Sequence, residues 1–172
     1  AFPEELRVVA DDHRCLVRSL MRRESLFDPD VTSFMGARGL VQLMPKTAER
    51  LSRDAGLTPP TSADLALPAL NVDLADRYVT LLLARFHHPL LAAAAYNAGP
   101  LAVLGFLEAQ KGVELDLFVE RIPFRETRLY VRAVGAALAA YGRLETGRIP
   151  AISLVLPPPE ATGVDAVLKV GR

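Results

Sequence analysis

Apolar residues recur at the spacing of an α-helix along most of the chain, and no alternation typical of a β-strand occurs before residue 150. Proline and glycine interrupt this pattern and indicate where helices begin and end. We therefore expect an all-α protein. Asp11 and Asp12 are expected to cap the first helix, and Asn71 the third. The expected helices cover residues 11–25, 45–55, 71–86, 90–97, 100–110 and 125–144, with a brief helical turn after residue 116.

The chain has 172 residues, of which 51% are apolar, and this suffices for one domain with its own hydrophobic core. We expect residues 1–148 to form that domain. The tail, residues 149–172, differs because Ile152, Leu154 and Leu156 alternate and three consecutive prolines at 157–159 favour an extended conformation. It is expected to pack on the helical domain or on a partner domain that is missing from the chain.

Charge and composition argue against several classes of partner. Lys plus Arg equals Asp plus Glu at 20 each, so no basic surface is expected to bind nucleic acid. The single Cys15 has no disulfide partner, and the three histidines lack metal-ligand spacing, so we expect neither a metal nor a cofactor. No apolar stretch approaches the ~20 residues of a transmembrane helix. Because the chain begins with Ala1, we expect a processed or excised piece that a signal peptide or an N-terminal domain precedes.

Glu24 falls in the last turn of the first expected helix, at the negative end of the helix dipole. This position disfavours the charged carboxylate by about 0.3–1 kcal/mol and therefore predicts a raised pKa. Leu26 and Phe27 follow, and shielding from water by these side chains would act in the same direction, which suits a general acid. Taken alone, a glutamate at a helix end is more often a solvated surface charge.

Three regions of the chain carry motifs. In the first, residues 23–29 are Arg-Glu-Ser-Leu-Phe-Asp-Pro, and residues 36–48 are Gly-Ala-Arg-Gly-Leu-Val-Gln-Leu-Met-Pro-Lys-Thr-Ala. The second, residues 94–100, is Ala-Ala-Tyr-Asn-Ala-Gly-Pro, and the third, residues 120–131, is Glu-Arg-Ile-Pro-Phe-Arg-Glu-Thr-Arg-Leu-Tyr-Val. In this order the regions resemble the soluble lytic transglycosylases, whose lysozyme-like domain is similar to goose-type lysozyme and belongs to glycoside hydrolase family 23. The resemblance covers residues 1–145.

The resemblance implies a peptidoglycan lytic transglycosylase that works in the bacterial periplasm or cell envelope. Glu24 would protonate the oxygen that links N-acetylmuramic acid to N-acetylglucosamine. It would then act as a base, so that the product is a 1,6-anhydro sugar and no water is used. Two alternatives remain open at this point: a hydrolase similar to goose-type lysozyme, and a non-catalytic peptidoglycan-binding module.

The resemblance also implies where a glycan strand binds. The implied contact residues are Ser33, Val41, Gln42, Met44, Tyr96, Asn97 and Tyr130. For Ser33 and Gln42, a hydrogen bond that stabilises their own loop is an equally good interpretation. Val41 departs from the methionine that is usual in the family at this position.

Several charged residues are given supporting or ordinary roles. Glu126 is expected to be a buried supporting residue. Asp28 and Asp30 are expected to face solvent in a turn. Arg121 and Arg128 are expected to pair with acidic neighbours, and contact with the peptide stem of peptidoglycan is the alternative.

Overall fold

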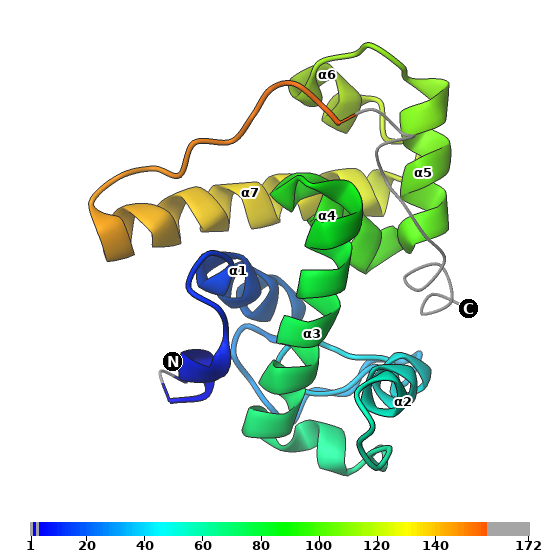
Figure 1. Cartoon of the computed structure of the whole chain (residues 1–172), viewed down its shortest axis with the longest axis vertical. Helices are drawn as coiled ribbons and strands as arrows, with labels where there is room; N and C mark the ends of the chain where they lie inside the picture. Colours follow the sequence, from blue (N-terminus) through cyan, green and yellow to red (C-terminus); the bar gives the residue numbers. More distant parts are fainter. Residues whose placement is uncertain (1, 3, 158–172) are drawn as a thin grey trace. The chain divides into compact units, whose positions relative to one another are not determined.

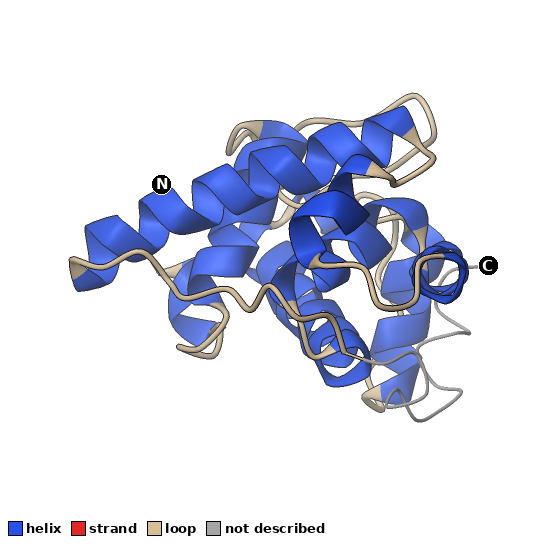
Figure 2. Cartoon of the chain, turned by 90° about the horizontal axis from the view of Figure 1, so that it is seen from above, coloured by secondary structure: helices blue, strands red, loops and turns tan. Residues whose placement is uncertain are grey.

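The structure is a computed structural model that describes residues 2 and 4–157. These residues form an all-α fold, as expected (Figures 1 and 2). They contain no β-strand, and only two isolated bridges join Thr32 to Arg38 and Arg38 to Leu43. The helices are η1 (Glu5–Val8), α1 (Arg14–Ser25), α2 (Pro45–Asp54), η2 (Asp64–Ala66), α3 (Pro68–Phe86), α4 (Pro89–Ala98), α5 (Pro100–Ala109), α6 (Leu115–Glu120) and α7 (Arg125–Thr146).

The chain divides into two compact units, residues 1–79 and residues 80–172, and α3 runs across the division. Unit 1 contains η1, α1, α2, η2 and most of α3, together with the long connection between α1 and α2. Unit 2 contains the end of α3, helices α4 to α7 and the tail. None of the helices in the described part of the chain is long and apolar enough to cross a membrane.

Helix α1 presents one apolar face, on which Leu16, Val17, Leu20 and Met21 are buried. Burial of side chains of this size stabilises a fold by roughly 1.5–3 kcal/mol each. The expectation that Asp11 and Asp12 cap this helix is wrong, because the N-cap is His13. Asp11 instead accepts a hydrogen bond from the guanidinium of Arg14.

Helices α2 and α3 both begin at a proline, which suits the first turn because proline lacks the backbone N–H that has no helical partner there. Gly56, with φ of 70°, follows the end of α2 as expected. The expectation that Asn71 caps α3 is wrong, because the helix begins three residues earlier at Pro68. Asn71 therefore lies inside α3, and its side chain is fully buried.

In unit 2, the alanine-rich α4 packs against both α5 and α7. Ala92, Ala93, Ala94 and Ala95 are buried, and their small side chains allow the neighbouring helices to approach closely. On α7, a Cβ atom at Gly135 would lie 3.3 Å from the Leu90 side chain, so the absence of one also helps this packing.

The described part of the tail, residues 149–157, contains neither helix nor strand and runs from the end of α7 to α6 (Figure 1). The carbonyl of Leu154 accepts a hydrogen bond from the backbone N–H of Leu115 at 2.9 Å. Near the end of α7, Gly142 leaves room for Pro150, since a Cβ atom there would be 2.2 Å from the proline ring. Two of the three prolines that predicted an extended segment, at 158 and 159, lie outside the described residues.

Candidate active site

The C-terminal end of α1 carries Glu24 in its last turn, with the side chain half-buried. The two residues that follow the helix, Leu26 and Phe27, have φ values of 53° and 68°. A left-handed conformation is costly for such side chains, and strained residues of this kind cluster at functional sites. Leu26 is 78% exposed and so contributes little of the shielding expected of it, whereas Phe27 is half-buried.

Ser25 joins the end of α1 to the connection that follows it. Its buried hydroxyl donates a hydrogen bond to the carbonyl of Leu40 at 2.8 Å, and it lies 3.2 Å from the carbonyl of Met21. The residue beside Glu24 is thus held against a segment that lies 15 residues further along the chain. The sequence motif contains Ser25, but no local pattern reveals its partner.

The connection between α1 and α2 is held by its own hydrogen bonds. The backbone N–H of Ser33 donates to the carbonyl of Ala37, and the Ser33 hydroxyl accepts from the N–H of Ala37, both at 2.9 Å. The Gln42 amide nitrogen donates to the carbonyls of Val31 at 2.9 Å and Gly39 at 3.0 Å. Ser33 and Gln42 therefore both form hydrogen bonds that stabilise their own loop, which was one of the two interpretations of the sequence. Each side chain remains half-exposed.

Asn71, which lies inside α3, forms hydrogen bonds to the connection between α1 and α2. Its side-chain oxygen accepts a hydrogen bond from the N–H of Val41 at 3.0 Å. Its amide nitrogen donates to the carbonyls of Arg38 at 3.1 Å and Leu65 at 2.9 Å. A buried asparagine with three partners of this kind holds the motif loop in one conformation.

Gly39 makes this close approach possible. Its φ is 80°, and a Cβ atom there would lie 2.2 Å from the Leu65 carbonyl oxygen and 2.5 Å from the Asn71 amide nitrogen. A side chain at position 39 would therefore displace Asn71 or the backbone at Leu65. The sequence alone indicates no role for Asn71 beyond a helix cap, although a polar residue beside the apolar stripe of α3 can signal such a tether.

Val41 and Met44 differ sharply in exposure. Val41 was expected to contact a bound sugar, but its side chain is fully buried, so that expectation is wrong. Its backbone N–H is bound to Asn71, which turns the residue inward. Met44, the residue before α2, is 40% exposed. Of these two positions, only Met44 offers a side chain to a ligand.

In unit 2, the end of α4 carries two of the expected residues and is joined to the start of α7 by a hydrogen bond. Tyr96 and Asn97 lie in the last turn of α4, and both are half-buried. The hydroxyl of Thr127 donates a hydrogen bond to the side-chain oxygen of Asn97 at 2.7 Å, which ties the end of α4 to α7. Tyr130, one turn further along α7, is 2% exposed. Thr127 lies within the third motif, but nothing in the local sequence reveals its partner.

The expectation that Glu126 is buried is wrong, because its side chain is exposed. The buried stripe of α7 contains Thr127, Tyr130, Val134 and Leu138. Glu126 stands beside this stripe in the first turn of the helix, where solvent reaches it.

Asp28 and Asp30, which follow Glu24 in sequence, face solvent as expected. Asp28 and Asp30 are exposed, and a carboxylate oxygen of Asp28 accepts the N–H of Asp30 at 2.9 Å, as a turn residue commonly does. In the described part of the chain, no three His, Cys, Asp or Glu side chains lie close enough to hold a metal ion.

His88 is a buried cap of α4. One ring nitrogen, Nδ1, accepts the N–H of Leu90 at 3.2 Å, so Nε2 carries the proton and donates to the carbonyl of Ser153 in the tail at 3.0 Å. Burial lowers the pKa of His88, and the hydrogen bond to Ser153 opposes this shift without cancelling it. The sequence marked His88 only as an ordinary residue at a helix break.

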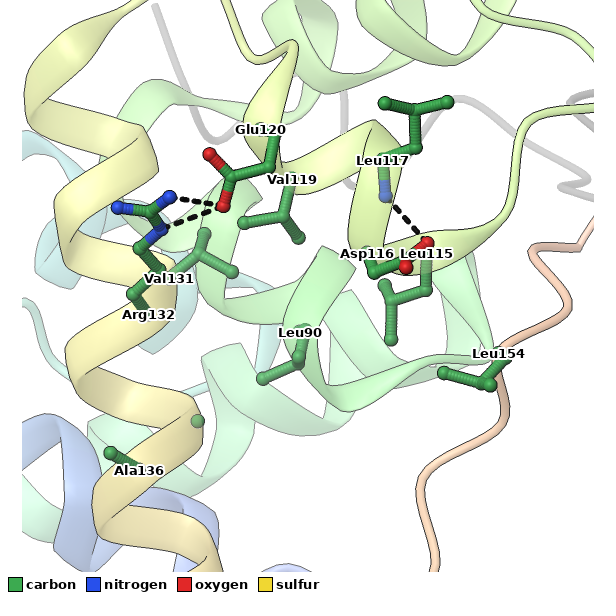
Figure 3. Close-up of a pocket in the computed structure, with 11 residues that line it drawn as sticks. Leu90, Leu115, Asp116, Leu117, Val119, Glu120, Val131, Arg132, Ala136 and Leu154 are labelled. Atoms are coloured by element: carbon green, nitrogen blue, oxygen red, sulfur yellow. Dashed lines mark hydrogen bonds and ion pairs between the residues drawn. The ribbon is translucent and has the colours of Figure 1, made fainter.

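A separate hollow of about 400 Å³ lies in unit 2 (Figure 3). Aliphatic side chains from α4, α6, α7 and the tail form most of its wall, among them Leu90, Val131 and Leu154. The ion pair between Arg132 and Glu120 stands at its edge. None of the residues expected to bind a glycan strand lines this hollow.

Comparison with known proteins extends these observations. A model of the transglycosylase SLT domain matches residues 11–118. The soluble lytic murein transglycosylase of Escherichia coli K12 is 36% identical over 137 residues, which make up 78% of this chain and 21% of that protein.

Two solved structures have a similar fold. One is an inactive mutant of the lytic transglycosylase Slt of Pseudomonas aeruginosa, in which glutamine replaces a glutamate. It has a TM-score of 0.79 and 34% identity, over 85% of this chain and 24% of that one. The other, the 70 kDa soluble lytic transglycosylase of Escherichia coli, has a TM-score of 0.82 and 29% identity, over 95% of this chain and 26% of that one. The chain thus spans about a quarter of these structures and a fifth of the curated relative.

Proposed function

The chain belongs to the transglycosylase SLT domain family, and on that premise we propose that it is a peptidoglycan lytic transglycosylase. It cleaves the β-1,4 bond between N-acetylmuramic acid and N-acetylglucosamine without water and leaves a 1,6-anhydro-N-acetylmuramic acid end. The observation that carries this proposal is the link between Ser25 and Leu40, which holds the helix end bearing Glu24 against the motif loop. The Pseudomonas aeruginosa relative, inactive when a glutamate is changed to glutamine, supports a mechanism with one essential glutamate.

Glu24 serves both chemical steps. Its acid form gives a proton to the oxygen that leaves with N-acetylglucosamine, while the bond from that oxygen to C1 of the muramoyl sugar breaks. The sugar's own acetamido group supports the cationic C1. The Glu24 carboxylate then takes the proton of the C6 hydroxyl as O6 bonds to C1, which closes the anhydro ring and restores the acid.

Ring closure is favoured over hydrolysis because Glu24 has no suitable second carboxylate among its neighbours in sequence. Most glycosidases use two carboxylates. Asp28, which is close to Glu24 in sequence, is exposed and engaged with the backbone of its own turn. A hydrolase similar to goose-type lysozyme would need a group to position water, and Asp28 is poorly suited to that task.

Each unit carries residues that we assign to contact with a glycan strand. On unit 1 they are Ser33, Gln42 and Met44, which remain partly exposed on a loop held rigid by hydrogen bonds. On unit 2 they are the half-buried Tyr96 and Asn97, whereas Tyr130, which is 2% exposed, has a supporting role, as does Glu126. Because peptidoglycan is the substrate, we place the enzyme in the bacterial periplasm.

Replacing Glu24 with glutamine tests the proposal, because the amide has a similar shape but cannot give or take the proton. Glu24→Gln should lower the cleavage rate of purified peptidoglycan by about 10²–10⁴-fold, the usual share of general acid–base catalysis. The matched control is Glu114→Gln, at an exposed glutamate before α6 that forms no side-chain cap.

Mass spectrometry of the wild-type products separates the candidate functions. Muropeptides that lack one water relative to hydrolysis products identify the transglycosylase, and fully hydrated products identify a hydrolase. Undiminished turnover by Glu24→Gln would remove Glu24 from the mechanism. Binding of peptidoglycan by the wild-type chain without any cleavage would indicate a non-catalytic module.

A further inference from the structure

The hollow in unit 2 exposes aliphatic side chains that come from four separate segments of the chain (Figure 3). Leu117 of α6 is 44% exposed and Leu154 of the tail is 57% exposed, although both line the same hollow of about 400 Å³. Leu90 of α4 and Val131 of α7 belong to the same aliphatic wall. Exposed apolar side chains that gather in one place mark a surface that another segment or molecule covers.

The tail is fixed at the edge of this hollow by hydrogen bonds. The carbonyl of Leu154 accepts the backbone N–H of Leu115 at 2.9 Å, and the carbonyl of Ser153 accepts the ring N–H of His88 at 3.0 Å. Because the side chain of Leu154 lines the hollow, the tail already forms part of the wall. The described chain ends only three residues later, at Pro157. The residues that follow therefore start beside the hollow.

Residues 158–172 lie outside the described residues, and their sequence contains one segment with an apolar stripe. Val164, Val167 and Leu168 recur at the spacing i, i+3 and i+4, which is typical of one face of a helix. A hollow of about 400 Å³ falls within the range of ~300–1,000 Å³ that accommodates several such groups. The segment therefore matches the hollow in both polarity and size.

The chain between the two is long enough to bring them together. Seven residues lead from Pro157 to Val164, and an extended chain of that length spans at most about 23–25 Å. The three prolines at 157–159 use about 9 Å of this length in an extended conformation. Gly163, directly before Val164, tolerates the backbone conformations that a reversal of direction requires.

The charges around the hollow and on the segment are of opposite sign. Asp116, Glu120 and Arg132 stand among the lining residues, which gives two negative charges against one positive charge and a net charge of −1. Residues 166–172 contain Lys169 and Arg172 and no acidic residue, which gives +2. Attraction between exposed charges is weak, so it orients the segment, whereas burial of the aliphatic side chains supplies most of the stabilisation.

We propose that the hollow is the docking site of the chain's own segment 164–170, with Val164, Val167 and Leu168 against its aliphatic wall. The segment thus covers the face of unit 2 that α4, α6 and α7 leave open. This inference goes beyond the proposed function and does not depend on it, because it concerns no residue assigned to cleavage or to glycan binding. Exchange of the segment between two copies of the chain is the alternative that the test separates.

Disulfide trapping in the full chain locates the segment. Ala136 and Ala140 are both exposed and lie one turn apart on α7, but only Ala136 lines the hollow. The test pair is therefore Val167→Cys with Ala136→Cys, and the matched control is Val167→Cys with Ala140→Cys. Mild oxidation is followed by mass spectrometry of tryptic peptides, which distinguishes the new disulfide from any that involves Cys15.

The disulfide between positions 136 and 167 should form within one chain and at least about fivefold faster than the disulfide between 140 and 167, because a disulfide tolerates only a narrow range of separations. Equal rates for the two pairs would show a segment with no fixed position and overturn the inference. Disulfides that form only between two chains would show exchange of the segment and overturn it as well.

Thermal denaturation tests the same contact without cysteines. Val167→Asp with Leu168→Asp should lower the melting temperature by about 4–10 °C, because two aliphatic side chains can no longer be buried. The matched control, Ala161→Asp with Thr162→Asp, adds the same charge to the connecting residues and should change it by less than about 2 °C. Equal effects of the two double variants overturn the inference.

A variant that blocks the hollow identifies the partner of the segment. In an Ala136→Arg background, the change at positions 167 and 168 should lower the melting temperature by less than about 2 °C, because the contact is already lost. In an Ala140→Arg background it should keep its full effect. The same decrease in both backgrounds would place the contact elsewhere and overturn the inference.

Discussion

Gly39→Ala offers a stringent test of the motif loop, because a near-identical substitution is available three residues away. Gly36 and Gly39 have φ values of 84° and 80°, so alanine at either position carries the same left-handed backbone strain of about 1–2 kcal/mol. The surroundings differ completely. A Cβ atom at Gly36 would meet nothing within 4 Å, whereas at Gly39 it would lie 2.2 Å from the Leu65 carbonyl oxygen.

The magnitude follows from what the new methyl group must displace. Moving Asn71 breaks its hydrogen bonds to Val41, Arg38 and Leu65. Each buried backbone group left without a partner costs about 1–3 kcal/mol. We therefore expect Gly39→Ala to lower the free energy of unfolding by about 3–5 kcal/mol more than Gly36→Ala, a large share of the usual stability of a domain.

Urea denaturation followed by far-ultraviolet circular dichroism measures this difference. Peptidoglycan cleavage by the same preparations should fall with the loss of the loop conformation in Gly39→Ala and persist in Gly36→Ala. Free energies of unfolding that agree within about 1 kcal/mol would refute the role assigned to the contacts of Gly39.

Two further predictions concern single polar side chains. Asn71→Ala should destabilise the chain by about 2–5 kcal/mol in urea, whereas Ser19→Ala, which removes a bond to a carbonyl of its own helix turn, should cost less than about 1 kcal/mol. Similar losses would contradict the tethering role of Asn71. Because burial lowers the pKa of His88, the unfolded chain binds more protons below pH ~6.5, and stability should fall as the pH drops through this region. The melting temperature between about pH 8 and about pH 5 should fall more steeply for the wild type than for His88→Asn, whose amide can cap α4 but cannot titrate. Parallel pH curves would rule out His88 as the source.

Helix boundaries were predictable where local chemistry decides them. Pro45 begins α2 and Pro100 begins α5, as expected, because a first-turn proline sacrifices no helical hydrogen bond. The end of α1 at Ser25 was also predicted correctly, which placed Glu24 in the last turn. These signals act within a few residues, so a single sequence is enough to reveal them.

The misjudged residues depend on partners far away in the chain. Asn71 looked like a helix cap because short polar residues favour caps, but two of its three partners lie 30 and 33 residues earlier. Val41 sits in a loop without a repeating period, and nothing local shows that its side chain turns inward. Glu126 and Tyr130 are four residues apart, a spacing that predicts one helical face. In the structure, the buried face of α7 contains Tyr130 and Thr127 but not Glu126.

The hydrogen bond from Thr127 to Asn97 fixes more than the distance between two helices. Because the Thr127 hydroxyl donates to the side-chain oxygen of Asn97, one of the two lone pairs of that oxygen is used and the orientation of the amide is set. The NH₂ group, which can only donate, forms no hydrogen bond within the described part of the chain and is the less encumbered half of the amide. In the glycan site that we propose, Asn97 would therefore favour an acceptor such as the carbonyl of an N-acetyl group.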